Sequence, residues 1–309
     1  MSKNKIQFQR GMSMQEFTKQ YGTEGQCIEA LASYRWPSGF ECSNCGCRKY
    51  CFLRTNNLYQ CNKCDKQISI TSGTIFHSTK LPLTTWFLAI YLMTQSKNGI
   101  SQLELARQVG VSSNTGASMY HKIAQVMLER EDSKPLSGGV EIDDAYWGGK
   151  KKGKRGRGST NKTPFIAAVE KVDSKPSRIK LNVVSRFSKA EIYKWATKNL
   201  DKGTSVLSDG LNCFPAVKDA GCLHTAIIVG NSKDKSKTAS FNWVNTILGN
   251  LKTALAGTFH KLHPKHLKRH LATFAYRFNR RYKLGGMIAR FAYIAVRTAP
   301  CPKWFLSAT

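Results

Sequence analysis

Two pairs of cysteines constrain the fold of this chain more than any other sequence feature. Each pair has the spacing CxxC, and fifteen residues separate the first pair from the second. A CxxC turn lets two thiolates reach one ion, so two such pairs predict a tetrahedral four-cysteine zinc site. Four thiolates leave no open coordination position, and we therefore expect the zinc to be structural. The predicted ligands are Cys42, Cys45, Cys61 and Cys64, whereas Cys47 and Cys51 match neither pair.

Helical patterns lie on both sides of this predicted ribbon. Residues 13–34 are expected to form one helix, and residues 81–93 a mostly buried one. Residues 101–129 have the spacing of a helix-turn-helix with Gly110 at the turn, although an ordinary αα-hairpin is the alternative. In a helix-turn-helix, the second helix can lie in a major groove. The side chains expected on its recognition face are Ser113, Asn114, Gly116, Ser118 and Lys122.

A short strand over residues 140–149 delivers Asp143 and Asp144 and stops at a glycine pair. The residues that follow, 150–158, are all Lys, Arg or Gly. The chain has 48 basic and only 19 acidic residues, so carboxylates beside such a loop are unusual. A hard metal ion held by carboxylate oxygens, with a polyanion alongside, explains both features. The alternative is a surface strand whose acids pair with nearby Lys and Arg.

The net charge of +29 indicates an anionic partner, because such an excess costs self-repulsion in the folded state. Nucleic acid is the first candidate and a membrane surface the second. No stretch approaches about 18 uninterrupted apolar residues, so we expect no membrane span. The first residues lack the apolar run of a secretory signal. Ten cysteines in such a chain indicate metal ligands and free thiols, not disulfides.

The second half of the sequence alternates strand and helix patterns. Strands are expected over residues 164–170, 178–184, 204–210 and 222–229. Helices are expected over residues 188–200 and 241–256. This order predicts an α/β layer fold with ligands at the ends of strands. Asp143 and Asp209 would then lie on neighbouring strands, where their carboxylates could share divalent ions.

Taken together, these segments resemble the ISXO-type insertion-sequence transposases. The residues that carry the resemblance are the acidic strand, Asp209 between Ser208 and Gly210, Asn245 with Lys252 seven residues on, residues 257–260, and residues 274–281. The similarity runs from about residue 13 to about residue 284. It implies an α/β ribonuclease-H-like catalytic domain, preceded by a zinc ribbon and a helical, helix-turn-helix-like region. The expected divisions are an N-terminal helical segment (1–37), the ribbon (38–72), the DNA-binding region (73–132), the catalytic domain (138–284) and a C-terminal helix and tail (285–309).

The resemblance also implies a catalytic site. Asp143 and Asp209 correspond to the first two acidic residues of a DDE triad, and the third position falls at Asn245. These three would hold Mg²⁺ or Mn²⁺, but an amide oxygen brings no charge, so Asn245 neutralises less than a carboxylate would. Asp234 is an alternative third ligand. Asp144 is expected to support the site from outside the ligand set.

The activity implied is cleavage and strand transfer of DNA at the ends of a mobile element, by two-metal phosphoryl transfer. The partners implied are double-stranded DNA, both the element's terminal repeats and the target, and a second copy of the chain. The protein would act in the cytoplasm on the bacterial nucleoid, with no membrane partner. The residues expected to contact DNA are Lys252, Arg277, Arg280, Arg281, Asn114, Lys122, Lys154 and Arg155.

Three alternatives stay open at this point. The chain could be a zinc-ribbon and helix-turn-helix DNA-binding protein with an inactive catalytic domain. It could also be a metal-dependent nuclease without strand transfer. Finally, His266 and His270, four residues apart, could contribute to a second zinc site, although a basic patch that contacts the DNA backbone suits this segment better.

Overall fold

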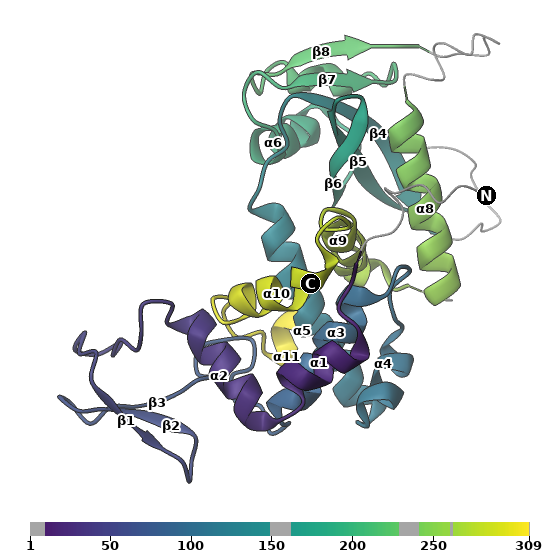
Figure 1. Cartoon of the computed structure of the whole chain (residues 1–309). Helices are drawn as coiled ribbons and strands as arrows, with labels where there is room; N and C mark the ends of the chain where they lie inside the picture. Colours follow the sequence, from purple (N-terminus) through teal and green to yellow (C-terminus); the bar gives the residue numbers. More distant parts are fainter. Residues whose placement is uncertain (1–9, 149–161, 229–240, 260–261, 309) are drawn as a thin grey trace. The chain divides into compact units, whose positions relative to one another are not determined.

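The computed structural model describes residues 10–148, 162–228, 241–259 and 262–308 (Figure 1). The chain divides into two compact units. The first comprises residues 1–126 and 280–309, and the second comprises residues 127–279. Among the described residues, no helix is both long enough and apolar enough to span a bilayer.

The first unit begins with two helices, α1 (Met14–Tyr21) and α2 (Glu24–Arg35), where the sequence predicted one. The prediction was wrong because α1 and α2 each begin with their own capping box, the first at Ser13 and the second at Thr23. Thr23 accepts a hydrogen bond from the backbone N–H of Gln26, and the side chain of Gln26 accepts one from the backbone N–H of Thr23. Such reciprocal caps satisfy free N–H groups at the start of a helix, so a new helix begins after Gly22.

Helix α3 (Leu83–Gln95) forms the apolar centre of this unit. Phe87, Ile90 and Met93 are almost fully buried. Two helices from the end of the chain complete this unit. Helix α10 (Met287–Ala295) packs against α3, and α11 (Lys303–Ala308) follows α10. The ribbon consists of three short antiparallel strands, which are β1 (Tyr50–Leu53), β2 (Leu58–Cys61) and β3 (Gln67–Ser69).

The predicted pair of helices around Gly110 is present as α4 (Gln102–Val109) and α5 (Ser113–Asp132). Gly110 has a φ of 71° and ends α4 in the left-handed conformation that glycine favours. The expectation that Gly116 belongs to an exposed recognition face is wrong. Gly116 is buried, and a Cβ atom there would lie 2.5 Å from the Cβ of Ala106 on α4.

Replacing Gly116 with Ala is therefore expected to destabilise the protein by about 1–3 kcal/mol, because the two helices must move apart. Gly25→Ala on α2 is the matched control, since its Cβ would meet nothing within 4 Å. The control should be neutral or more stable by up to about 1 kcal/mol. Urea unfolding monitored by circular dichroism measures both variants. Equal unfolding midpoints for Gly116→Ala and wild type would contradict the close approach.

The second unit is built on a five-stranded sheet in the order β6-β5-β4-β7-β8. The strands are β4 (Gly139–Trp147), β5 (Thr163–Val172), β6 (Lys175–Val183), β7 (Ser205–Ser208) and β8 (Leu223–Ala226). The pairs β4–β5 and β5–β6 are antiparallel, whereas β4–β7 and β7–β8 are parallel. Three antiparallel strands extended by two parallel ones give the ribonuclease-H-like sheet, which confirms the expected fold class.

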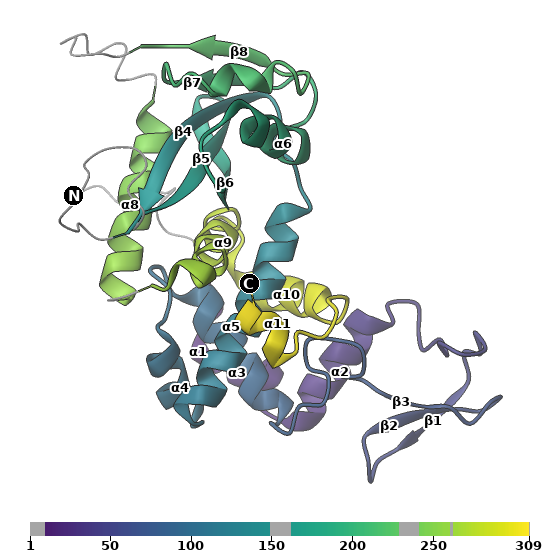
Figure 2. The same cartoon turned by 180° about the vertical axis from the view of Figure 1, so that it is seen from behind.

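Helices cover both faces of this sheet (Figures 1 and 2). One apolar core joins the sheet to α8 (Asn242–Thr258) and α9 (Leu267–Phe278), which a short 3-10 turn (Pro264–His266) precedes. The other core joins it to α6 (Lys189–Asn199) and the 3-10 turn η1 (Phe214–Val217). Alternate residues of each strand enter alternate cores, so the position of a residue along a strand decides which helix layer it faces.

Asn279, at the end of α9, attaches that helix to the edge strand β6. Its side-chain oxygen accepts a hydrogen bond from the backbone N–H of Ile179 at 2.7 Å. Its amide nitrogen donates to the backbone oxygen of Ile179 at 3.0 Å and also to the carboxylate of Glu131. Asn279 thus replaces the partner strand that β6 lacks at this point.

Candidate active site

Asp143 and Asp209 lie side by side at the centre of the sheet. In the parallel pair of β4 and β7, Ile142 is opposite Ser208. The next residue on each segment is an aspartate, so the register itself brings the two carboxylates together. Their ligand oxygens, with that of Asp144, lie within 4.8 Å of one another. All three side chains are partly accessible to solvent.

The alternation of β4 places Asp143 on the face covered by α8. Ala145 belongs to the core that includes α8, whereas Val140 and Ile142 belong to the core on the α6 face. Because successive residues of a strand alternate between the two faces, Asp143 lies on the same face as Ala145, and Asp144 lies on the same face as Ile142. Leu207 packs against the α8 core, so Asp209 follows the same parity as Asp143. Asp143 and Asp209 therefore face the α8 layer. Asp144 alternates with Asp143 along the strand, yet one of its carboxylate oxygens lies within 4.8 Å of theirs.

Hydrogen bonds hold these aspartates in place. The backbone N–H of Asp144 donates to Asp143 Oδ1 at 2.8 Å, and the backbone N–H of Leu211 donates to Asp209 Oδ1 at 3.2 Å. The hydroxyl of Ser208, just before Asp209, lies 2.8 Å from His224 Nε2 on β8. Burial is the main cause that lowers the pKa of His224, so its imidazole favours the neutral form.

Asn245, the expected third ligand, lies in the first turns of α8, and its side chain is exposed. The buried stripe of α8 includes Val244, Leu248 and Leu251, so Asn245 borders the face that packs on the sheet. Lys252 is two turns farther along, on roughly the same side of the helix, and is also exposed. The structure thus brings the helix of Asn245 to the face of Asp143 and Asp209.

Glu141 is a buried acid beside the carboxylate group that the sequence analysis did not single out. It is 2% exposed and lies two residues before Asp143 on the same face of β4. Its Oε2 accepts a hydrogen bond from the backbone N–H of Val244 at 3.0 Å, and its Oε1 lies 3.1 Å from Lys171 Nζ. The period-2 pattern of an acidic residue on each side of Ile142 is the one signal that could have pointed to it.

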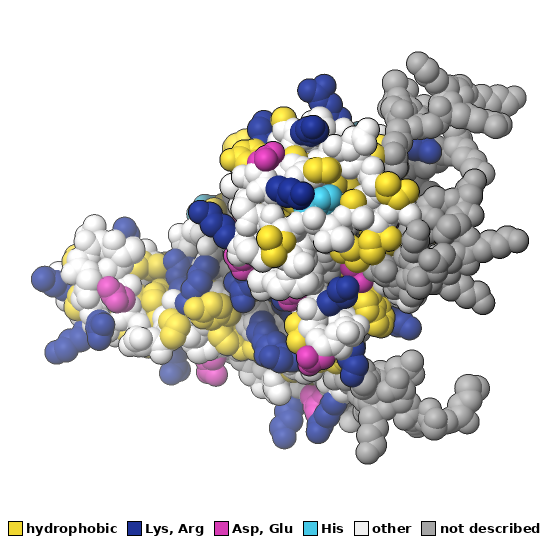
Figure 3. All heavy atoms as spheres, turned by 90° about the horizontal axis from the view of Figure 1, so that it is seen from above, with side chains coloured by type: hydrophobic (Ala, Val, Ile, Leu, Met, Phe, Trp, Pro, Cys, Tyr) yellow, Lys and Arg dark blue, Asp and Glu magenta, His cyan; other side chains and the backbone are white. Residues whose placement is uncertain are grey.

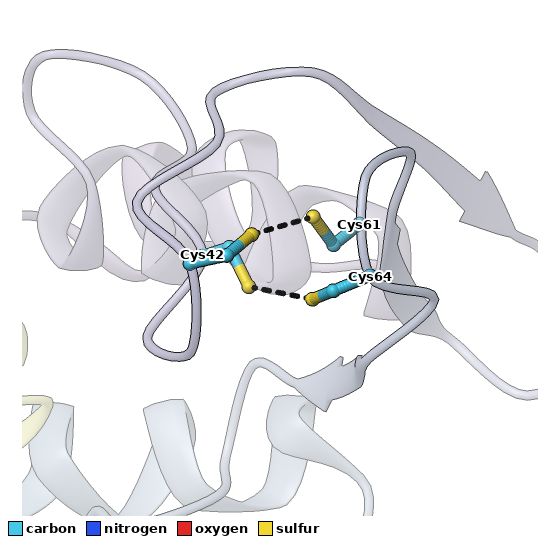
Figure 4. A group of neighbouring side chains, drawn as sticks. Cys42, Cys61 and Cys64 are labelled. Atoms are coloured by element: carbon cyan, nitrogen blue, oxygen red, sulfur yellow. Dashed lines mark hydrogen bonds between the residues drawn. The ribbon is translucent and has the colours of Figure 1, made fainter.

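The four predicted zinc ligands converge, and Figure 4 shows thiols of two facing loops pointing toward one another. The Sγ atoms of Cys42 and Cys64 are 3.6 Å apart, and those of Cys45 and Cys61 are 3.5 Å apart. Zn–S bonds of about 2.3 Å in a tetrahedron place sulfur atoms about 3.8 Å apart, so the donor set and its size fit zinc. A hydrogen bond from the backbone of Lys66 is the main cause that lowers the pKa of Cys64 to about 6. In the same group, a backbone hydrogen bond from Cys47 lowers the pKa of Cys45, but burial and hydrogen bonds with the other thiols outweigh it and raise that pKa to about 12. Cys47 and Cys51 lie outside this group.

The residues expected to contact DNA differ in exposure. Asn114 is exposed, but Lys122 is half-buried, with its ammonium 5.9 Å from the ring centre of Trp86, and burial lowers its pKa. Arg277, Arg280 and Arg281 are all partly exposed. Figure 3 shows many more basic than acidic side chains on the face that it displays.

Two further expectations need comment. Lys154, Arg155 and the alternative ligand Asp234 lie outside the described residues. His270 is buried and packs edge-on against Phe259, while His266 contacts Arg269. Neither histidine belongs to a group of metal-ligating side chains within the part of the chain that the structure describes.

The sheet order and the carboxylate group define a class, the ribonuclease-H-like proteins with acidic side chains clustered at the sheet centre, here preceded by a four-cysteine ribbon. Comparison with known families gives two matches. Residues 135–279 match the ISXO2-like transposase domain, and residues 22–67 match the transposase zinc-ribbon domain. Residues 135–279 therefore belong to the ISXO2-like transposase domain family, and residues 22–67 to the transposase zinc-ribbon family.

Individual relatives are more distant. An uncharacterized protein in transposable element ISH50 of Halobacterium salinarum is 30% identical over 132 residues, and the match spans 41% of this chain and 43% of that protein. A chain in the structure of the simian T-cell lymphotropic virus intasome in complex with PP2A regulatory subunit B56 gamma is 10% identical with a TM-score of 0.30, over 56% of this chain and 63% of its own. The Mos1 strand transfer complex is 13% identical with a TM-score of 0.21, over 63% and 76%. TM-scores this low do not establish a shared fold, so the fold assignment rests on the sheet order of this chain.

Proposed function

We propose that this protein is an insertion-sequence transposase that cleaves and joins DNA at the ends of its element. The observation that carries the proposal is the register of β4 and β7, which places Asp143 beside Asp209 within a matched transposase domain. A protein that only bound DNA would gain nothing from adjacent carboxylates in a chain of net charge +29, since they repel the phosphate backbone.

Each residue of the site has a role in this proposal. Asp143 and Asp209 hold divalent metal, Mg²⁺ or Mn²⁺, through carboxylate oxygens, and Asn245 adds an amide oxygen from α8. The metal would activate water or a DNA 3′-hydroxyl and stabilise the leaving oxygen. Asp144 keeps additional negative charge close to the ligands, which offsets the neutrality of Asn245. Lys252 holds a DNA phosphate beside the site.

The remaining elements hold the DNA. Asn114 and Lys122 of α5, the arginines Arg277, Arg280 and Arg281, and the basic loop with Lys154 and Arg155 contact the element ends or the target. The ribbon is held together by structural zinc. Bringing two ends together requires at least a second copy of the chain, and work on chromosomal DNA places the protein in the cytoplasm. We retain the five divisions of the chain given above as part of this proposal.

The test is cleavage of a duplex that bears the element's own ends, with Mg²⁺ or Mn²⁺. We expect nicked or joined products from wild type, none from Asp209→Ala, and only slow residual cleavage from Asn245→Ala, which loses a neutral ligand and no charge. Both variants should bind the duplex. Normal cleavage by Asn245→Ala would mean that another residue is the third metal ligand, and Asp234 would be the next candidate. If wild type binds the ends but never cuts with either metal, the inactive DNA-binding alternative replaces the proposal.

A further inference from the structure

The first turn of α8 carries Asn245 but has no local side-chain cap. The residue at its N-cap is Phe241, whose side chain makes no capping hydrogen bond. The first N–H groups of a helix have no partner within the helix, and a buried donor without a partner is costly. Glu141 of β4 supplies the acceptor, since its Oε2 lies 3.0 Å from the backbone nitrogen of Val244. The cap of α8 therefore comes from 103 residues earlier in the chain.

This cap is buried and charged. Glu141 is 2% exposed, and its second oxygen pairs with Lys171 of β5 at 3.1 Å. A carboxylate at a helix N-terminus also interacts favourably with the helix dipole. A hydrogen bond to a charged acceptor out of water is directional and hard to exchange for solvent. The contact therefore fixes where the first turn of α8 meets β4.

A second contact holds the same turn against the sheet. Trp243 donates from Nε1 to the backbone oxygen of Ser174 at 2.8 Å. Asp173 and Ser174 form the tight turn between β5 and β6, and both have positive φ, as in a type I′ hairpin. Trp243 and Val244, the two residues before Asn245, are thus each attached to a rigid part of the sheet.

We propose that Glu141 is a positioning residue that sets Asn245 against Asp143 by holding the first turn of α8 on β4. The inference rests on the proposed function, in which Asn245 and Asp143 share the metal site. Glu141 and Asp143 are two residues apart on one face of one strand, roughly 6.7 Å along it. Val244 and Asn245 are consecutive on one helix. The Glu141–Val244 hydrogen bond therefore joins β4, which carries Asp143, to α8, which carries Asn245. It does so within two residues of each proposed ligand.

A double-mutant cycle between Glu141 and Asn245 tests this inference. The proteins compared are full-length wild type, Glu141→Ala, Asn245→Ala and the double variant, with the element-end duplex. We expect Glu141→Ala to slow cleavage about 10- to 100-fold in the wild-type background, since small misplacements of site residues have effects of this size. In the Asn245→Ala background the same change should have no further effect.

Two measurements without DNA accompany the rates. Calorimetry with Mn²⁺ should show weaker binding to Glu141→Ala and to Asn245→Ala, and no additional weakening in the double variant. Amide hydrogen exchange over residues 242–247 should rise in Glu141→Ala. Glu141→Gln keeps an acceptor for the N–H of Val244, so its cleavage rate should stay within about threefold of wild type. This variant also tests the inference if Glu141→Ala does not fold.

Glu170→Ala is the matched control. Glu170 is also a buried acid of this unit, 6% exposed, and it accepts a hydrogen bond from the backbone N–H of Ser137 and pairs with Arg178. Since these partners lie outside α8, its loss should lower stability without changing Mn²⁺ affinity. Its effect on cleavage should multiply with that of Asn245→Ala.

The outcomes separate this inference from the proposed function. If Glu141→Ala costs the same factor with Asn245 present and absent, in cleavage or in Mn²⁺ affinity, Glu141 is merely structural and the inference fails. A loss of tenfold or more in Glu141→Gln that does not depend on Asn245 overturns it as well. If wild type never cuts, the proposed activity fails, and the Mn²⁺ cycle still decides whether Glu141 acts through Asn245.

Discussion

Replacing Asp143 with Asn is expected to lower the rate of DNA cleavage at least about a thousandfold, with DNA affinity unchanged or slightly higher. The carboxylate faces the α8 layer beside Asp209, where it would hold metal. Metal stabilisation of a phosphoryl-transfer transition state amounts to several kcal/mol, and each 1.36 kcal/mol is a factor of ten in rate. The amide keeps the size of the side chain, so the fold should survive.

The measurement is single-turnover cleavage of the element-end duplex, with affinity followed by fluorescence anisotropy. Asp219→Asn is the matched control, because Asp219 is an exposed acid of the same unit outside the carboxylate group. It undergoes the same chemical change and should cleave like wild type. Asp144→Asn should fall between the two. Cleavage by Asp143→Asn at the wild-type rate would refute the assignment of the metal site.

The second large effect concerns the ribbon. Cys61→Ser should remove the bound zinc and leave residues 42–69 without stable structure. The strands β1 to β3 have four, four and three residues, too few to fold without a further constraint. Structural zinc sites of this kind contribute apparent binding free energies of about 10–16 kcal/mol at pH 7, and this energy is folding energy.

Zinc content by atomic emission and hydrogen exchange over the ribbon would measure this loss. The matched control is Cys51→Ser, whose thiol is exposed and lies outside the four-cysteine group. It should keep one zinc per chain and the protection of wild type. Retention of zinc and of protected ribbon amides by Cys61→Ser would show that the four thiolates do not form one site.

The features that the sequence predicted best depend on local pattern. The spacing of the cysteine pairs predicts that the four thiols come together, and the acidic strand with Asp209 predicts which strand ends bring carboxylates together. The break between α1 and α2 was also visible in principle, because Thr23 and Gln26 have the spacing of a capping box. The apolar pattern of residues 13–34 continues through Gly22, and this continuity is what predicts a single helix.

What the sequence could not give are contacts between residues far apart in the chain. Glu141 looks like any acid in a strand until Val244, 103 residues later, is placed over it. Asn279 stands among arginines and resembles part of a DNA-binding run, yet its partner is the backbone of Ile179, 100 residues earlier. In both cases a side chain forms a hydrogen bond with a backbone group, and the sequence does not show which backbone groups need such a partner.

The contact of Asn279 with β6 has a consequence for how copies of this protein can associate. An edge strand with free N–H and C=O groups invites pairing with a strand of another molecule. At Ile179 both groups are already occupied, and α9 packs along β6. Continuous sheet formation through this edge is therefore blocked. Under the proposed function, two copies that meet on paired DNA ends would therefore join through other surfaces, because Ile179 offers no free backbone group to a second strand.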